Sequence, residues 1–251
     1  MINISKNIYR NRFLLGLAIC LLGSACSQSE APPGAQSGQL TDVSVVTYME
    51  REPGTDTYPV RILVSPGHVR FDDGYDDSDY TLLDRRTRTL YSVSHESSSV
   101  LVIENHPPGD TTTPADLSLT EERIVDNDAP TIAGKQPLQF NYLANGTLCY
   151  QTISVAGLMD AAVAGMTEYA TALGERQRGD LQTVPEELQT PCFLSRYAYA
   201  SERHYIHGLP LQIWDDAGYS SSLTDFQDSE MVSSALFEVP ENYERIQLGQ
   251  Q

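Results

Sequence analysis

Four cysteines are the residues whose positions say most about chemistry in this sequence. Cys20 and Cys26 lie near the start of the chain, and Cys149 and Cys192 lie in its second half. Cysteine thiols can pair as disulfides, bind metals, react as nucleophiles or carry lipid. Which of these applies depends on the compartment, so the start of the chain has to be interpreted first.

Residues 1–25 have the order of a secretory signal peptide. Lys6, Arg10 and Arg12 precede the apolar run Phe13–Leu22, which gives way to small residues before Cys26. The apolar run is about half of the ~20 residues that a membrane-spanning helix needs. The sequence therefore predicts export of the chain and removal of residues 1–25.

The end of this segment resembles the lipobox of bacterial lipoproteins, in which a cysteine after two small residues is acylated and becomes the new N-terminus. That cysteine is Cys26, although Gly23 stands where a leucine is usual and Leu22 lies one position earlier. The resemblance implies a palmitate-type anchor on Cys26. Ser27 follows where an aspartate would resemble an inner-membrane retention signal, which implies transfer to the outer membrane. The alternative is an ordinary signal peptide cleaved after Ala25, leaving a free thiol.

The two remaining cysteines form an even pair. Cys20 leaves with the signal peptide and Cys26 carries lipid, so Cys149 and Cys192 are left in a compartment that permits disulfides. We predict that they are bonded to each other. A metal site and a reactive thiol pair remain as alternatives, although the chain has no CxxC spacing to favour either.

Composition limits the partners of the chain. Its 251 residues, 40% apolar and 20% charged, suit a single domain. Acidic residues outnumber basic ones by 34 to 16, which gives a formal charge of -18. Phosphate backbones would be repelled by such a surface, so we expect no nucleic-acid partner.

Two further clusters could hold metals. Five aspartates between Asp72 and Asp79 offer the oxygen ligands that calcium prefers, but their spacing is not that of a DxDxDG loop and no bidentate Glu follows. A solvated hairpin tip is the competing interpretation. His204 and His207 stand three apart, as zinc ligands can, yet no third ligand lies nearby in sequence. We therefore assign no metal.

Motifs for catalysis are missing from the sequence. It contains no GxSxG, HExxH, Walker or GxGxxG pattern. We therefore predict that the chain is not an enzyme, with no catalytic residue and no cofactor.

The pattern of residues predicts one domain of class α+β, mainly antiparallel β. Residues 26–40 are small and polar and should form a flexible tether, residues 41–246 a single globular domain, and residues 247–251 a tail. Short alternating runs separated by turns favour a meander, and Asn145-Gly146 favours a tight hairpin turn. The candidate strands are Val43–Met49, Val60–Val64, His68–Asp72, Tyr80–Asp84, Thr89–Val93, Val100–Ile103, Leu117–Val125, Leu138–Leu143, Leu148–Val155, Leu209–Trp214 and Tyr219–Phe226.

Helical periodicity appears once clearly. Leu158–Leu173 places Met166 and other apolar residues on one face, and Gly174 is expected to end the helix. A second helical stretch is expected at Cys192–Tyr199. The Cys149–Cys192 bond would then join that stretch to a hairpin strand.

Several segments resemble proteins with the fold of the bacterial lipoprotein-localisation carrier and receptor, the Lol-like fold. The recurring pattern is a strand with an arginine, a strand ending in aspartate and a strand with an aromatic residue. It occurs here as His68–Asp72, Leu82–Arg86 and Thr89–Val93, and phrases of uncharacterised periplasmic relatives occur at Gly208–Leu211 and Leu236–Tyr243.

The resemblance implies a curved, incomplete β-barrel around one or two packed amphipathic helices, with a concave apolar face that holds acyl chains. The resulting functional expectation is a lipid-anchored protein on the periplasmic face of the outer membrane. It would bind a lipidic or other apolar ligand near the helix Leu158–Leu173, or act in envelope assembly. No ligand-binding residue is assigned, because that lining is not a motif. The alternative is a structural or interaction module with a filled interior and no ligand.

Overall fold

A computed structural model describes residues 39–104, 112–126 and 128–247, which belong to one compact unit. Cys26, the signal peptide 1–25 and the predicted tether as far as residue 38 lie outside the described residues. Within the described part, no helix combines the length and apolar character needed to cross a membrane.

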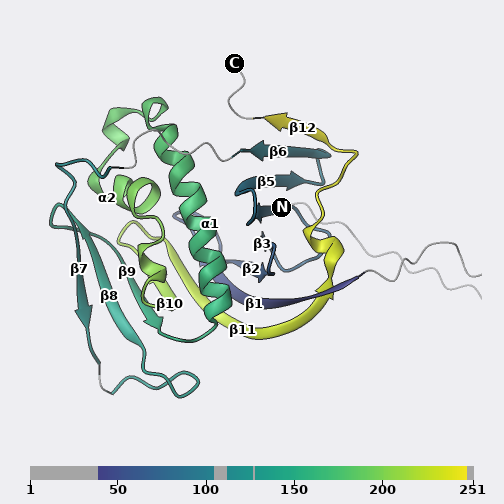
Figure 1. Ribbon diagram of the computed structural model, residues 1–251. Helices are drawn as coiled ribbons and strands as arrows, with labels where there is room; N and C mark the ends of the chain where they lie inside the picture. Colours follow the sequence, from purple (N-terminus) through teal and green to yellow (C-terminus); the bar gives the residue numbers. More distant parts are fainter. Residues whose placement is uncertain (1–38, 105–111, 127, 248–251) are drawn as a thin grey trace, which may run out of the picture. The chain divides into compact units, whose positions relative to one another are not determined.

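The described residues form one mainly antiparallel sheet of twelve strands that does not close on itself (Figure 1). Its order is β12-β6-β5-β4-β3-β2-β1-β11-β10-β9-β8-β7. The predicted α+β class with antiparallel strands is thus confirmed. The strands are β1 Leu40–Arg51, β2 Tyr58–Val64, β3 His68–Asp72, β4 Tyr80–Asp84, β5 Thr89–Ser94, β6 Ser99–Ile103, β7 Leu119–Ile124, β8 Leu138–Ala144, β9 Thr147–Val155, β10 Leu209–Trp214, β11 Ser220–Ser233 and β12 Glu244–Gln247.

Apart from β12, two meanders make up the sheet, as the regular spacing of short strands predicted. Strands β1 to β6 pair in chain order, and so do β7 to β11. The long strands β1 and β11 pair with each other over their whole length and join the two meanders. In the β8–β9 hairpin, Asn145 and Gly146 have φ angles of 50° and 78°, the left-handed values that a two-residue turn requires.

Helix α1, Asp160–Gly179, is longer than predicted, because Gly174 does not end it. A Cβ atom on Gly174 would lie 2.3 Å from Oγ of Ser201. The glycine is therefore explained by the close approach of residues 198–201, not by a helix stop. Leu173, expected on the apolar face, is 41% exposed.

The principal core lies between α1 and one face of the sheet. Ala162 and Met166 of α1 are buried, and they belong to one cluster with Val46, Ile62 and Val64 of β1 and β2. The predicted apolar stripe of the helix therefore serves as core up to its last turns.

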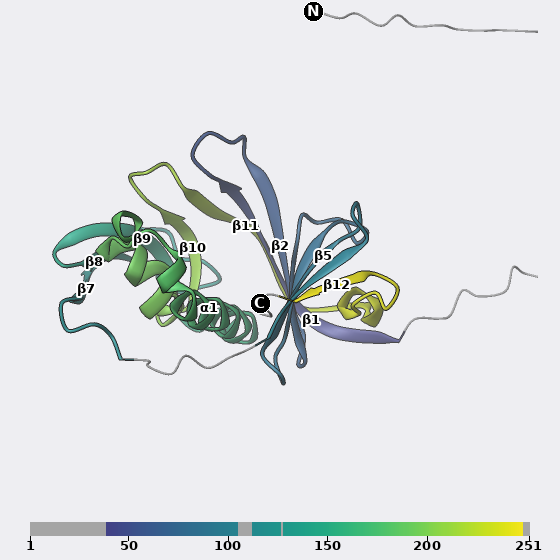
Figure 2. The ribbon, with the colours of Figure 1, turned by 90° about the horizontal axis from the view of Figure 1, so that it is seen from above.

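A second core covers the opposite face of β2–β6. In Figure 2 the turn Ser234–Phe237 lies on the side of these strands away from α1. Leu63 and Leu82 point to that face, where they pack with Leu236 and Phe237 of the 3₁₀ turn Ser234–Phe237. After this turn the chain reaches β12, whose pairing with β6 is parallel. These central strands are thus buried on both sides.

Sequence patterning missed β12 and the second half of β11. Residues 224, 225 and 227–231 of β11 are exposed, so no apolar alternation marks this part of the strand. Pairing with β1 extends β11 to Ser233 in spite of its polar sequence.

Five short helical elements, all between α1 and β10, complete this part of the chain. They are the 3₁₀ turns Leu181–Thr183, Glu186–Leu188 and Arg203–Tyr205 and the helix α2, Pro191–Phe193, which continues directly into the π-helix Leu194–Tyr199.

Candidate functional site

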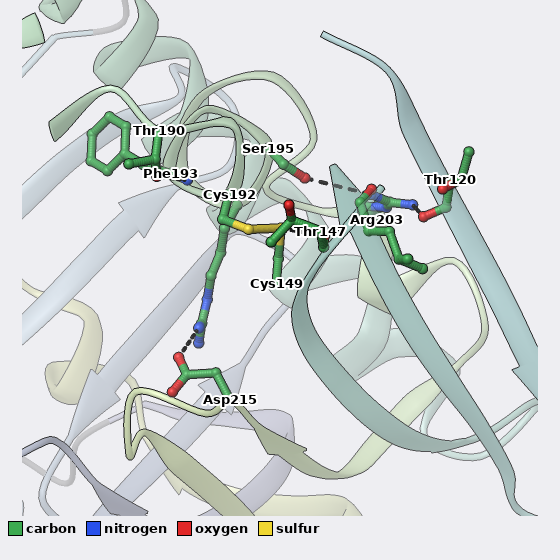
Figure 3. The surroundings of a disulfide bond; sticks show 11 residues. Thr120, Thr147, Cys149, Thr190, Cys192, Phe193, Ser195, Arg203 and Asp215 are labelled. Carbon is green, nitrogen blue, oxygen red and sulfur yellow. Dashed lines mark hydrogen bonds and ion pairs between the residues drawn. A yellow bond between two sulfur atoms is a disulfide. The ribbon is translucent and has the colours of Figure 1, made fainter. Parts of the chain in front are cut away.

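The predicted disulfide is present and joins the second meander to the short helices (Figure 3). Cys149 lies on β9 and Cys192 on α2, with sulfur atoms 2.07 Å apart and Cα atoms 5.1 Å apart. The covalent bond therefore fixes the start of the helical segment against the sheet.

Local sequence explains where the helical segment begins. Oγ1 of Thr190 accepts a hydrogen bond from the Phe193 N–H at 3.2 Å, and Pro191 occupies the first helical position. Both features are typical of a helix start. The π-helix then ends with the Ala200 N–H donating to the Ser195 carbonyl at 3.0 Å. Such wide turns occur often at functional sites.

A pocket of about 330 Å³ opens beside the disulfide. It lies between the helical segment, β9 and the turn that follows β10, so three chain segments contribute to it. This volume is at the lower end of the range for small-molecule sites. The lining residues are Leu148, Cys149, Tyr150, Gln151, Thr190, Cys192, Phe193, Arg196, Tyr197, Asp215, Asp216 and Ala217.

Arg196 is one of the lining residues. Its Nη1 donates to Oδ2 of Asp215 at 2.7 Å, and both side chains are largely buried. The guanidinium carbon lies 4.5 Å from the ring centroid of Tyr219, 5.2 Å from that of Tyr150 and 5.5 Å from that of Tyr197. The positive charge is therefore enclosed by one carboxylate and three aromatic rings.

A second carboxylate, that of Glu50, interacts electrostatically with Arg196. Oε1 of Glu50 accepts hydrogen bonds from Tyr219 Oη at 3.3 Å and from Ser221 Oγ at 3.0 Å. Burial raises the pKa of Glu50, while these hydrogen bonds and the charge of Arg196 counteract the rise. The Tyr219 N–H also donates to Oδ1 of Asp215 at 3.0 Å, which fixes the turn.

Beneath the pocket lies a buried group of aromatic and basic side chains. Tyr142 and Tyr150 stack with ring centroids 4.7 Å apart, and the ring of His204 meets Tyr150 edge-on. Burial, together with the charges of Arg196 and Arg203, lowers the pKa of His204 to about 3. Its Nδ1 is buried and has no hydrogen-bond partner among the described residues. His204 is therefore neutral.

The structure separates the two histidines considered as zinc ligands. His204 points into that buried group, whereas His207 stacks on Phe140 with ring centroids 3.8 Å apart. Nε2 of His207 lies 3.0 Å from Oε1 of Glu121 on β7. The described residues hold no group of three or more His, Cys, Asp or Glu side chains arranged to bind a metal.

The acidic segment between Asp72 and Asp79 pairs with arginines. Asp72 accepts from Arg61 Nε at 2.8 Å and from Arg70 Nε at 2.7 Å, and Asp76 accepts from Arg61 Nη2 at 2.8 Å. Burial acts to raise the pKa of Asp72, but the arginine hydrogen bonds outweigh it and hold the pKa below its usual value. Asp72 and Asp76 neutralise arginines, and the described residues hold no group of carboxylates arranged to bind a metal.

A second pocket, of about 470 Å³, lies between β3–β5 and the segment before β12. Arg70 borders it with its charge bound to Asp72 and its Nη1 donating to the Leu236 carbonyl at 2.6 Å. Tyr80 stacks over this guanidinium and donates to the Glu238 carbonyl at 2.6 Å. These polar groups fasten the chain to itself, so we treat this pocket as structural.

Sequence reasoning found the disulfide but not the residues that make the pocket. Arg196 follows Cys192 by four positions in the predicted helical stretch, a spacing that places both on one face. That was the available signal. Asp215 and Asp216 lie between the predicted strands Leu209–Trp214 and Tyr219–Phe226, so the sequence marks them only as turn residues. The approach of Asp215 to Arg196 is a tertiary contact.

Comparisons with known proteins do not assign a function to this pocket. No family model matches the chain, and no curated protein matches it. Two solved structures of PNGF-II, in space groups C2 and P21, show TM-scores of 0.40 and 0.38 at 9% identity. Each comparison covers 82% of this chain and 31% of the PNGF-II chain. Likeness at this level defines neither a shared fold nor a shared activity.

Proposed function

We propose that this chain is an interaction module without enzymatic activity, lipid-anchored through Cys26 on the periplasmic face of the outer membrane, with an interior filled by its own side chains. The lipobox-like segment and the preceding signal pattern support the anchor and its location. The packing of α1 supports the filled interior.

The observation that carries the proposal is the burial of the helix face that was expected to border an apolar cavity. Met166 is 1% exposed and Ala162 is fully buried. A Cβ atom on Gly165 would lie 2.5 Å from Cγ1 of Val64, so helix and sheet are in close contact. Close packing of this kind supports an interior that is filled by the chain's own side chains.

A curved half-barrel related to the Lol-like fold remains part of this proposal. In Figure 1 the paired strands β1 and β11 bend around α1, which supports a curved sheet.

A charged substitution on the buried face of α1 tests whether the interior is filled or holds a lipid cavity. The mature chain carrying Cys26→Ser is titrated with a fluorescent fatty acid, and we expect no saturable binding. Met166→Glu should abolish cooperative folding, because it buries an unpaired charge. Leu173→Glu is the matched control on the exposed part of the same helix and should stay folded. Saturable binding that a folded Met166→Glu variant weakens would reverse the conclusion in favour of an apolar ligand.

The anchor has its own test. Cys26→Ser should move the protein from the membrane pellet to the soluble periplasmic fraction, because the acylated thiol is lost. Sedimentation of the variant with the membrane would contradict the lipid anchor.

A further inference from the structure

We propose that the disulfide pocket binds one basic side chain, a lysine or an arginine, of a partner protein. The inference rests on the proposed interaction function and adds to it the chemistry of the partner. Charge balance, exposed aromatic faces and pocket size support it, and each concerns residues that line the pocket or contact its wall.

Charge is the first argument. The single cation of the pocket wall, Arg196, already donates to Asp215 and lies near Glu50. Asp216 lines the pocket, is exposed and has no hydrogen-bond or ion-pair partner among the described residues. Carboxylates thus outnumber cations, so a second cation is attracted and an anionic ligand is repelled.

Aromatic faces are the second argument. Tyr197, 49% exposed, and Phe193 lie four residues apart on the helical segment, with ring centroids 5.5 Å apart. Both rings line the pocket together with Asp216. An ammonium or guanidinium group is stabilised by aromatic faces and by a carboxylate at the same time. A neutral ligand would gain only the contact with the rings.

The volume of the pocket and the net negative charge of the whole chain both agree with a basic side chain as occupant. About 330 Å³ accommodates one long side chain. The formal charge of -18 attracts a basic partner over distance, which increases the rate of encounter.

The test is an NMR titration of the mature chain carrying Cys26→Ser with the capped peptide acetyl-Gly-Arg-Gly-amide. We expect saturable shifts at the backbone amides of Phe193, Tyr197 and Asp216, weakened by added salt. The same peptide with citrulline, which keeps the shape and lacks the charge, should bind at least about threefold more weakly.

Variants at the pocket have matched controls at the hairpin tip before β4. Asp216→Asn and Tyr197→Ala should each weaken peptide binding by roughly three- to tenfold. Asp77→Asn and Tyr75→Ala change an exposed aspartate and a 69% exposed tyrosine elsewhere and should leave binding unchanged.

The remaining outcomes are distinct. Equal binding of the arginine and citrulline peptides would overturn the cation assignment. If the folded chain shows no peptide shifts and also binds no fatty acid, the basic-side-chain proposal for this pocket is refuted. The interaction-module proposal is then unaffected. If the chain binds fatty acid saturably and a folded Met166→Glu variant binds it more weakly, the interaction-module proposal is refuted.

Discussion

The core under α1 and the region around the disulfide are stabilised in different ways. Between α1 and β1–β2, apolar side chains such as Val64 and Met166 are buried with few polar groups among them. Around the disulfide, Tyr150 packs with Arg196 and His204, and the charges there need specific partners.

Length of the helical elements accounts for the difference. Helix α1 has 20 residues, whereas α2 has three and the π-helix has six. Short segments bury little apolar area and form poorly alone. The second region therefore depends on a covalent bond and on charged hydrogen bonds, and these also leave room for an open pocket.

Removal of the disulfide should have the largest effect and should be local. Cys149→Ala with Cys192→Ala releases a loop with a sequence separation of 43, which the chain-entropy model values on the order of 4 kcal/mol. Urea unfolding measures the loss. Amide exchange should rise in residues 147–155 and 191–199 more than in α1. A uniform rise over both regions would show that they are one cooperative unit.

Acid should destabilise the disulfide region through His204. Its pKa of about 3 in the folded chain lies below about 6.5 for an unfolded histidine, so the unfolded state binds the extra proton between these values. The free energy of unfolding therefore keeps its full contribution from the neutral ring above pH 6.5. It falls by a few kcal/mol as the pH drops toward 3.

The variant His204→Gln should therefore lose less stability than the unchanged chain between pH 7 and pH 4. Urea unfolding at a series of pH values measures this. His207→Gln alters the histidine that pairs with Glu121 and should leave the acid loss in place. Parallel pH curves for His204→Gln and the unchanged chain would refute the assignment.

Tight packing under α1 is tested by two glycines of the same helix. Gly165→Ala adds a methyl group against Val64 and should cost about 1–3 kcal/mol. Gly179→Ala meets no atom within 4 Å and should be neutral or slightly stabilising. Thermal unfolding compares the two, and equal effects would mean that α1 is less closely packed than the structure shows.

Exposed charge should matter least. Arg85 donates two hydrogen bonds of 2.7 Å to Glu168 on α1, but Glu168 is 44% exposed. Glu168→Gln should cost less than about 1 kcal/mol. Asp215→Asn should cost more, because that variant leaves the largely buried Arg196 without its charged partner. The reverse order would indicate that the pocket arginine is well solvated.

The sequence by itself determined most strands, the position of α1 and the cysteine pair. Alternation in segments such as His68–Asp72 has period two, and Asn145-Gly146 adopts its turn by local backbone preference. Both signals depend on neighbours in the chain, which a sequence displays directly.

Tertiary structure alone decided the role of Gly174, the length of β11 and the pocket at Arg196. Gly174 is needed because Ser201 approaches the helix closely, and β11 is long because it pairs with β1. Arg196 lines the pocket with its charge paired to Asp215, on a turn 19 residues away. Each depends on contacts between segments that are separated in sequence. Local propensity carries no information about such contacts, because they form only when packing brings the segments together.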